Sequence, residues 1–198
     1  MDFTLPSQPV PMFPLPRVFL FPHQLLPLHV FEPRYRRMVE DQLDGAGRLV
    51  LATIPDGEAE TPEHQPAVHD VAGLGEIVRH ERQADGRFMI WVMGLCRVRV
   101  HEVASDRPYR RVQCEPFPEI DATEAEAELP RKLRVALAAR LQQPVELPES
   151  APVALLADLL LQALRPPAGT MARVFAEPSI ARRARLVLGL ARESPPPA

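Results

Sequence analysis

The hydrophobic and polar positions divide the chain into a front part with strand-like patterns and a back part with helical spacing. In the front part, short apolar runs are broken repeatedly by proline, as in Val10–Pro16, Arg17–Pro22 and Gln24–Phe31. Proline removes a backbone donor from a strand ladder and is therefore confined to edges and bulges. We expect the first two of these segments to be edge or bulged strands.

One helix is predicted inside the front part. It begins at Glu32–Pro33, because proline is tolerated in a first helical turn, and it ends before Gly45. Its apolar positions recur at the spacing of one helix face: Tyr35, Met38, Val39 and Leu43. The following run, Arg48–Ile54, is almost wholly apolar and predicts a buried strand.

Residues 68–103 predict antiparallel strands joined by a tight turn at Asp85–Gly86. Phe88–Met93 is apolar on both faces, as central strands are, so Trp91 is expected in the core. Gly94 predicts a bulge or bend. Beyond it, three apolar residues alternate with three basic ones, which predicts one buried and one solvated face: Cys96, Val98 and Val100 against Arg97, Arg99 and His101.

The back part has helical spacing. Helices are predicted over about 129–142, over 154–164, over about 170–176 and after Pro178. Residues 144–152 are expected to form a linker, and residues 194–198 to fray.

The patterns together predict an α+β protein. We place a β-rich domain at residues 1–118 and an α-helical subdomain at residues 119–198.

Composition excludes several classes of function. The 198 residues carry a formal net charge of −3, which disfavours nucleic-acid binding because that affinity rests on clustered cations. Cys96 and Cys114 form no disulfide framework and no zinc pattern, so we expect buried free thiols and a cytoplasmic location. We expect neither a secretion signal nor a membrane span, because no apolar stretch approaches roughly 18 residues.

Catalytic motifs are also missing from the sequence. Lys132 is the only lysine and lies in a predicted helix, so there is no P-loop, and no serine lies in Gly-x-Ser-x-Gly. No two histidines have the spacing of a metal pair on a helix, although a surface metal site at His64 and His69 stays open as an alternative. We therefore expect no catalytic residue, no cofactor and no metal.

The segment Met12–Tyr35 contains FPLP, LFP, LPLH and FEPRY in that order. In these motifs it resembles the amino-terminal, substrate-binding domain of the ATP-dependent Lon protease. The similarity continues in Gly73–Val78, in Asp85–Arg87, in Val92–Val100 and at Pro108–Tyr109, and it covers roughly Pro11 to Ala191. Residues Cys96–Val98 depart from the family's usual Arg-Phe, which we interpret as a variation in the core.

The resemblance implies a PUA-like β pseudo-barrel with one helix, followed by a helical bundle. Lon continues into an ATPase module and a Ser–Lys protease module, and this chain ends before both. The resemblance therefore implies a stand-alone Lon-N-like protein that is not an enzyme. It also implies a candidate surface for a ligand or peptide at five residues: Arg17, His29, Glu32, Arg34 and Tyr35.

A structural role for the charged motif residues is the competing interpretation, because Glu32 would stabilise the amides at the start of the helix. We expect the phenylalanines of the same segment to lie in the core: Phe13, Phe19, Phe21 and Phe31.

Three functions stay open at this point. The first is a non-catalytic module that binds unfolded or extended polypeptide, with a role in protein quality control. The second is an adaptor that acts through a protease or chaperone partner and docks through residues 154–164. The third is a small-ligand-binding or enzymatic protein built on a PUA-like barrel. No oligomeric state is predicted.

Overall fold

The computed structural model of the chain describes residues 4–58, 61, 64–121, 127–141 and 147–193. The chain divides into two compact units, Met1–Phe117 and Pro118–Ala198. The first unit contains the strands and one helix, and the second contains four helices among its described residues.

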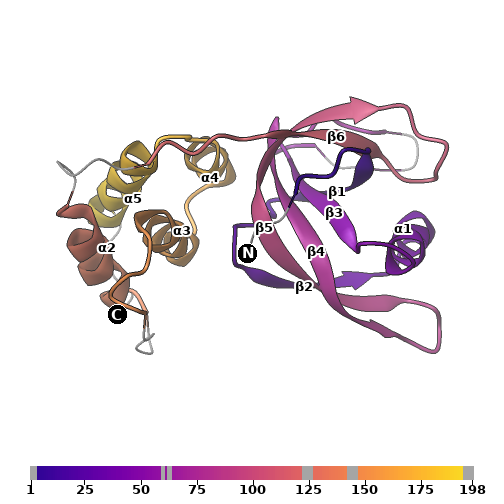
Figure 1. Cartoon of the computed structure of the whole chain (residues 1–198), viewed down its shortest axis with the longest axis horizontal. Helices are drawn as coiled ribbons and strands as arrows, with labels where there is room; N and C mark the ends of the chain where they lie inside the picture. The colour runs from indigo at the N-terminus through magenta and orange to yellow at the C-terminus, as the bar shows by residue number, and fades with distance from the viewer. Residues whose placement is uncertain (1–3, 59–60, 62–63, 122–126, 142–146, 194–198) are drawn as a thin grey trace. The chain divides into compact units, whose positions relative to one another are not determined.

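The first unit is a strongly curved mixed sheet (Figure 1). Its elements in chain order are β1 (Val10–Pro16), β2 (Leu25–Val30), α1 (Pro33–Leu43), β3 (Arg48–Ile54), β4 (Val71–Arg82), β5 (Phe88–Val103) and β6 (Arg111–Pro116). The strand order is β2-β5-β4-β3-β1-β6, and a further pairing of β5 with β6 closes five of the strands into a ring, with β2 outside it. The predicted α+β class with a β pseudo-barrel is confirmed.

Two strands share one edge of β5. Residues Phe88–Met93 pair with β2 and Val98–Val103 pair with β6, while β4 lies along the other edge. The register of β4 against β5 shifts beside Gly94, which confirms the predicted bulge. Because a bulge bends its strand, the first half of β5 can carry β2 while the second half closes the barrel.

One charged side chain after Gly94 is buried against expectation. Arg97 is 3% exposed, and its guanidinium lies 5.6 Å from the centroid of the Phe21 ring. The prediction that Arg97 lies on the solvated face is therefore wrong, and that face begins at Arg99. Cys96, Val98 and Val100 do contact a hydrophobic core, as predicted, but the opposite face of the strand is covered at Arg97 by the loop that carries Leu20 and Phe21.

The segment between β1 and β2 is a buried loop, so the prediction of an extended strand at Arg17–Pro22 is wrong. Arg17 and His23, at its two ends, have φ values of 59° and 64°, and these left-handed conformations take the chain out of strand geometry. Between them Leu20 and Phe21 are at most 2% exposed. Backbone bonds tie the end of the loop to β5, since His23 N–H donates to the Gly94 carbonyl at 2.8 Å.

Glycines of β4 and β5 make room for this loop. A Cβ at Gly73 would lie 2.3 Å from the Leu20 carbonyl oxygen, and a Cβ at Gly94 would lie 2.0 Å from the Phe21 carbonyl oxygen. No side chain is compatible with these approaches, so the two strands accept the loop only where a side chain is missing.

Pro14 of β1 lies at a position where the backbone N–H of another residue would have no hydrogen-bond partner in the sheet. β1 is not the edge strand that the sequence predicts, because it pairs with β3 along Met12–Pro16 and with β6 at Val10–Pro11. Met12 donates its N–H toward β6, to the Arg110 carbonyl at 2.8 Å. Pro14 shares this orientation and lies beyond the short pairing with β6, so its missing N–H leaves no bond unmade.

The helix α1 has the predicted start and the predicted inward face. Pro33 occupies its first turn after Glu32, and Tyr35, Met38 and Val39 are buried. These side chains join one of the hydrophobic cores of the unit, together with Phe13 and residues of β2, β3 and β5.

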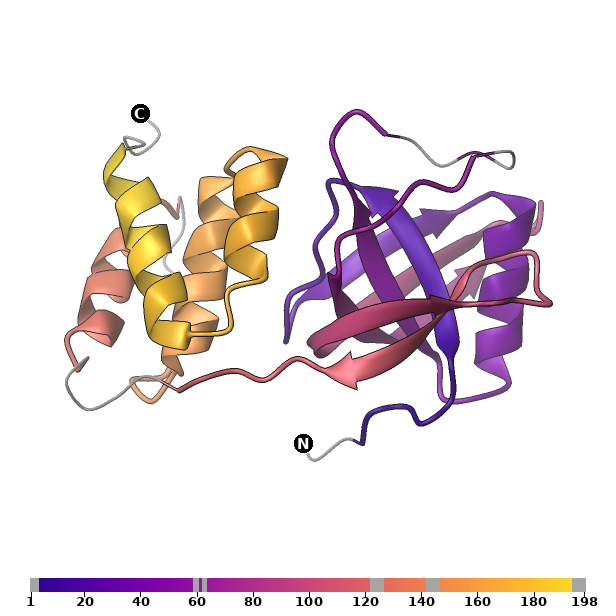
Figure 2. The ribbon, with the colours of Figure 1, turned by 90° about the horizontal axis from the view of Figure 1, so that it is seen from above.

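The second unit consists of α2 (Leu129–Ala138), α3 (Val153–Leu164), α4 (Ala168–Phe175) and α5 (Ile180–Glu193) (Figure 2). The helix predicted to reach about Gln142 ends at Ala138. Gln142, residues 144–146 of the expected linker and residues 194–198 lie outside the described residues. Among the helices that the structure describes, none combines the length and the apolarity needed to cross a bilayer.

A fully buried arginine organises the helical unit. The Arg183 side chain is 0% exposed and lies 2.6 Å from a Glu119 carboxylate oxygen and 3.4 Å from an Asp158 carboxylate oxygen. Its Nη1 donates to the Glu177 carbonyl at 3.2 Å. Because an isolated buried charge is very costly, these contacts join α3, α5 and the segment before α2 into one unit. A parallel backbone bridge of Ile120 with Ser179 adds to them.

We expect Gly94→Ala to lower the free energy of unfolding of the first unit by about 3 kcal/mol, because the new methyl group meets the Phe21 carbonyl. Urea unfolding followed by the fluorescence of Trp91, the single tryptophan, measures this. The control is Gly169→Ala, since a Cβ at Gly169 meets no atom within 4 Å. Equal unfolding midpoints for Gly94→Ala and the unaltered chain would contradict the close approach of loop and strand.

Candidate functional site

The outside of the barrel presents an apolar face on β2 and the first half of β5. On β5 the even-numbered residues Phe88, Ile90 and Val92 are buried, so the odd-numbered residues point outward. On β2 the outward residues are Leu25, Pro27 and His29. We call the outward set the outer strip: Leu25, Pro27, His29 and Phe31 from β2 and its end, and Met89, Trp91 and Met93 from β5.

The pairing register brings the two halves of the outer strip together. Leu25 lies opposite Met93, Pro27 opposite Trp91, and His29 opposite Met89. Leu25 and Phe31 are 49% and 59% exposed, while the three residues from β5 are half-buried. Large apolar side chains thus lie side by side at a solvated surface, and such patches mark interaction sites more often than scattered single residues do.

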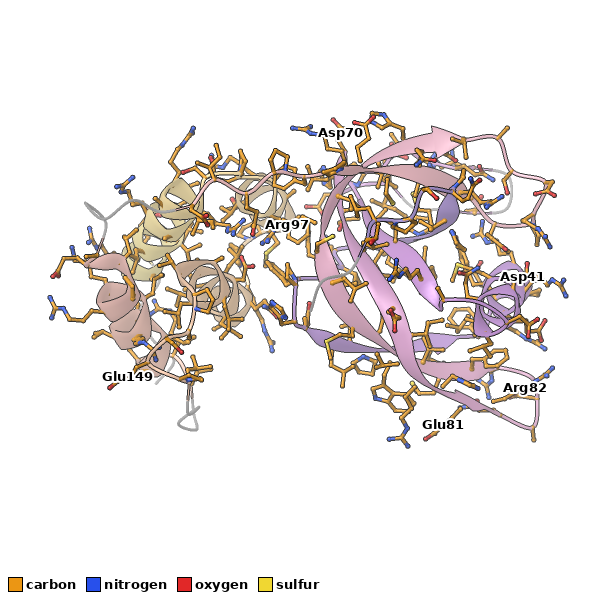
Figure 3. The ribbon with its side chains drawn as sticks, in the orientation of Figure 1. Asp41, Asp70, Glu81, Arg82, Arg97 and Glu149 are labelled. Carbon is orange, nitrogen blue, oxygen red and sulfur yellow. The ribbon has the colours of Figure 1, made fainter. Side chains whose placement is uncertain are left out.

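The neighbouring strand β4 gives the outer strip a charged flank. The Arg79 guanidinium lies over the Trp91 ring, 4.4 Å from its centroid, and also pairs with Glu81. Figure 3 shows Glu81 and Arg82 together at one end of the sheet. A second register shift between Ile77 and Arg79 leaves Val78 52% exposed beside them.

Two predictions about aromatic residues are wrong at this face. Phe31 and Trp91 were expected in the core, and both belong to the outer strip. Trp91 lies in a strand that is apolar on both faces, and hydrophobicity alone does not say which of two apolar faces meets solvent. The alternation of Leu25, Pro27 and His29, with a proline inside the run, was the available signal for an edge strand with one open face.

Three of the five predicted site residues lie together at the start of α1. Arg34 pairs with Glu32 at 3.0 Å, and its guanidinium lies 4.6 Å from the centroid of the Tyr35 ring. Tyr35 is 3% exposed and packs on Phe13 with 4.4 Å between ring centroids, so its ring belongs to the core. Glu32 and Arg34 therefore form a charged group that Tyr35 supports from inside.

Of the other two predicted residues, one joins the outer strip and one lies apart. His29 is exposed on β2, with its ring centroid 5.9 Å from that of Phe31. Arg17 follows Pro16, which is level with Ile54 at the end of β3, and it pairs with Asp56 at 3.0 Å.

The register places these two residues at opposite ends of β4. His29 is level with Met89 and Glu81, whereas the Arg17 end of the sheet is level with the start of β4. Figure 3 shows Asp70, just before β4, at the end opposite Glu81. The structure therefore brings His29, Glu32 and Arg34 near one another and leaves Arg17 outside this group.

A partly buried carboxylate, that of Asp41, fixes the other end of α1 to the barrel. Asp41 accepts a hydrogen bond from the Tyr109 hydroxyl at 2.7 Å and lies 3.0 Å from Arg37 and 3.3 Å from Arg107. Desolvation, with the hydrogen bond to Asp41, raises the pKa of Tyr109 to about 12, so the phenol keeps its proton at neutral pH. These contacts hold α1 in place, and with it Glu32 and Arg34.

The described residues offer little for metal or thiol chemistry. Within the ranges that the structure describes, no three His, Cys, Asp or Glu side chains gather closely enough to hold a metal ion. Both cysteines are free; Cys114 is buried and Cys96 is half-buried, which corrects the expectation for Cys96. Burial raises the pKa of the Cys114 thiol to about 11, so it is not a nucleophile at neutral pH.

The apolar helix α3 is not an open docking surface. Leu156, Leu160 and Leu161 are fully buried, and its other leucines are half-buried. Exposed leucines on residues 154–164 would have favoured the adaptor hypothesis as stated from the sequence, and the structure gives that surface no support.

Comparison with known proteins identifies related sequences and folds. A family model described as the ATP-dependent protease La (LON) substrate-binding domain matches residues 9–193. A Lon protease 2 of Syntrophobacter fumaroxidans is 32% identical over 118 residues, and a Lon protease of Trichlorobacter lovleyi is 31% identical over 132 residues. The matches cover 59% and 65% of this chain but only 15% and 16% of those two proteins.

Two solved structures share the fold at low sequence identity. A Lon N-terminal domain protein from Xanthomonas campestris matches with a TM-score of 0.66 and 22% identity, covering 92% of this chain and 98% of that one. The N-terminal domain of the Mycobacterium avium complex Lon protease matches with a TM-score of 0.69 and 15% identity, covering 94% of this chain and 99% of that one.

Because Trp91 is the single tryptophan and lies in the outer strip, its emission reports on this face. We expect acrylamide to quench Trp91 in the folded chain, and to quench it more efficiently in Arg79→Ala, which uncovers the ring. Arg82→Ala is the matched control, since that guanidinium lies over Phe88. A native tryptophan that resists quenching would contradict its outward position.

Proposed function

This chain belongs to the family of LON substrate-binding domains, and on that premise we propose that its first unit binds extended, apolar polypeptide through the outer strip and the adjoining free edge of β2. The observation that carries the proposal is the pairing of an apolar face with an open strand edge on the same strand.

The apolar side chains of the outer strip can contact polypeptides of many different sequences. Met89 and Met93 flank Trp91 on one strand, and methionine side chains adapt their shape to different partners. Phe31 and Leu25, at the two ends of β2, add the most exposed area. A flexible apolar surface of this kind recognises hydrophobicity and not a fixed sequence, which suits a module that binds unfolded chains.

The free edge of β2 supplies backbone groups for an added strand. Among the described strands β2 pairs with β5 alone. Gly94 N–H donates to the Gln24 carbonyl at 2.8 Å, so the even-numbered residues of β2 face β5 and the odd-numbered residues turn their backbone groups to the free edge. An extended polypeptide can therefore bond to Leu25 and His29 by strand addition.

Pro27 limits the number of hydrogen bonds that the free edge of β2 can donate. It lies midway between Leu25 and His29, with its missing donor on the free side. A proline at an open edge keeps the strand from pairing indiscriminately with other edges, while its carbonyl still accepts a hydrogen bond. The edge is therefore suited to short, reversible pairing.

Charged groups at the end of the outer strip form its polar rim. His29 contacts Phe31, and Glu32, which follows Phe31 in the chain, pairs with Arg34. Arg79 and Glu81 lie along β4. We retain His29, Glu32 and Arg34 as contact residues of the proposed surface. Tyr35 supports the surface from the core, and Arg17 lies outside it.

In the cell, we propose that this binding serves protein quality control and that the chain holds polypeptide without cleaving it. The family model describes a substrate-binding domain, and the proposed surface supplies apolar side chains and backbone groups that suit holding a polypeptide.

Titration of the whole chain with a permanently unfolded, apolar model polypeptide tests the proposal through Trp91 emission. We expect saturable binding that Phe31→Ser weakens about tenfold, because it removes an exposed aromatic anchor. Ile120→Ser is the control, since Ile120 is equally exposed on the helical unit, at 60%. Absence of saturable binding, or equal weakening by the control, would refute the proposal.

The free edge is tested by moving a proline along β2. His29→Pro removes a donor that faces outward, so we expect a stable fold with weaker polypeptide binding. Leu28→Pro removes a donor that faces β5, so we expect a loss of stability of about 3 kcal/mol. Urea unfolding and the Trp91 titration measure the two effects. If His29→Pro binds polypeptide as the unaltered chain does, the contact does not use strand addition.

A further inference from the structure

A basic groove lies between α2 and α5 of the helical unit. It has a volume of about 380 Å³, and four cations line it: Arg131, Lys132, Arg140 and Arg192. Its apolar lining is Val135, Leu188 and three alanines. No carboxylate is among the described residues that line the groove.

Both helices present rows of side chains to this groove. On α2 and its end, Lys132 and Arg140 are eight residues apart on one row, and Val135 lies on the next row. On α5, Leu188 and Arg192 are one turn apart. Rows at a spacing of four residues are the ridges between which another helix packs, so the groove is shaped for a helical segment.

Val135 is the exposed apolar side chain of this surface. It lies two residues from both Leu133 and Leu137, so it is on the opposite face of α2, and it is 65% exposed while those two leucines are buried. It is the most exposed of the large apolar side chains described in the chain. An exposed valine at the rim of a groove lined with alanine provides an apolar contact for a partner.

The charges of the groove indicate that its partner is negatively charged. Arg131 pairs with Glu128 at 3.0 Å, and Arg140 donates to the Ala191 carbonyl. For Lys132 and Arg192 the structure describes no ion pair among its placed residues. The hydrogen bond and charge of Arg131, with a smaller contribution from Lys132, lower the pKa of Glu128, as a positive local potential does.

We propose that the groove between α2 and α5 docks an acidic amphipathic helix of a partner protein. Its apolar stripe lies on Val135, Leu188 and the alanines, and its carboxylates meet Lys132 and Arg192. A second copy of this chain fits poorly, because a symmetric contact would place the four cations of one groove against those of the other. The site is separate from the outer strip, so it holds independently of the function proposed above.

The test uses the whole chain and a labelled synthetic peptide of roughly 20 residues, with a leucine stripe at helical spacing flanked by glutamates. We expect saturable binding by fluorescence anisotropy, and roughly a tenfold loss of affinity in Val135→Glu and in the double variant Lys132→Glu/Arg192→Glu. The same peptide with lysines in place of the glutamates should not bind.

Arg173→Glu is the control, because it makes the same charge reversal as each single substitution of the double variant, at a position on α4 in a different groove. Circular dichroism establishes that all variants keep the helical fold. The proposal is overturned if the acidic peptide does not bind or if Arg173→Glu weakens binding as much as the groove variants do. It is also overturned if Val135→Glu abolishes self-association of the chain, or its binding to anionic vesicles, and leaves peptide binding unchanged.

Discussion

The proposed function depends on a contact between backbones at Gly94. There the Phe21 carbonyl lies so close to β5 that no side chain is tolerated, and the loop between β1 and β2 is bonded to the same glycine. The loop therefore delivers β2 to the first half of β5, while the bulge beside Gly94 turns the second half toward β6. As a result the barrel closes without β2, and β2 keeps an open edge.

This arrangement explains why an apolar surface persists next to a well-packed core. The inward residues of β2 and β5 complete the core with α1, so the unit needs nothing more from the outward residues. Trp91 and its two methionine neighbours can therefore contact a partner. In the chain alone, Arg79 covers part of the tryptophan ring. The charged group at the start of α1 is held in place from behind by Tyr35 and, through the helix, by Asp41.

Local sequence patterns correctly predicted those helices, strands and turns that depend mainly on their own residues. The apolar stripe of α1, the strand at Arg48–Ile54 and the turn at Gly86, with φ of 82°, follow from periodicity and turn chemistry. The buried loop at Leu20 and the burial of Arg97 could not be predicted, because the loop depends on glycines far away in the sequence and Arg97 is covered by Phe21 of that loop. The Lon-like motifs indicated His29, Glu32 and Arg34, whereas Trp91 and Val135 became visible only when the structure showed which apolar faces remain uncovered.

Amide hydrogen exchange along β2 tests the account most directly. In the free chain the Leu25 and His29 amides, which face the open edge, should exchange rapidly, while those of Leu26 and Leu28 should be protected by β5. On saturation with unfolded polypeptide, the exchange of Leu25 and His29 should slow by about tenfold or more, with Leu26 and Leu28 unchanged. Protection of Leu25 and His29 in the free chain, or their continued rapid exchange in the complex, would contradict an open edge that pairs with substrate.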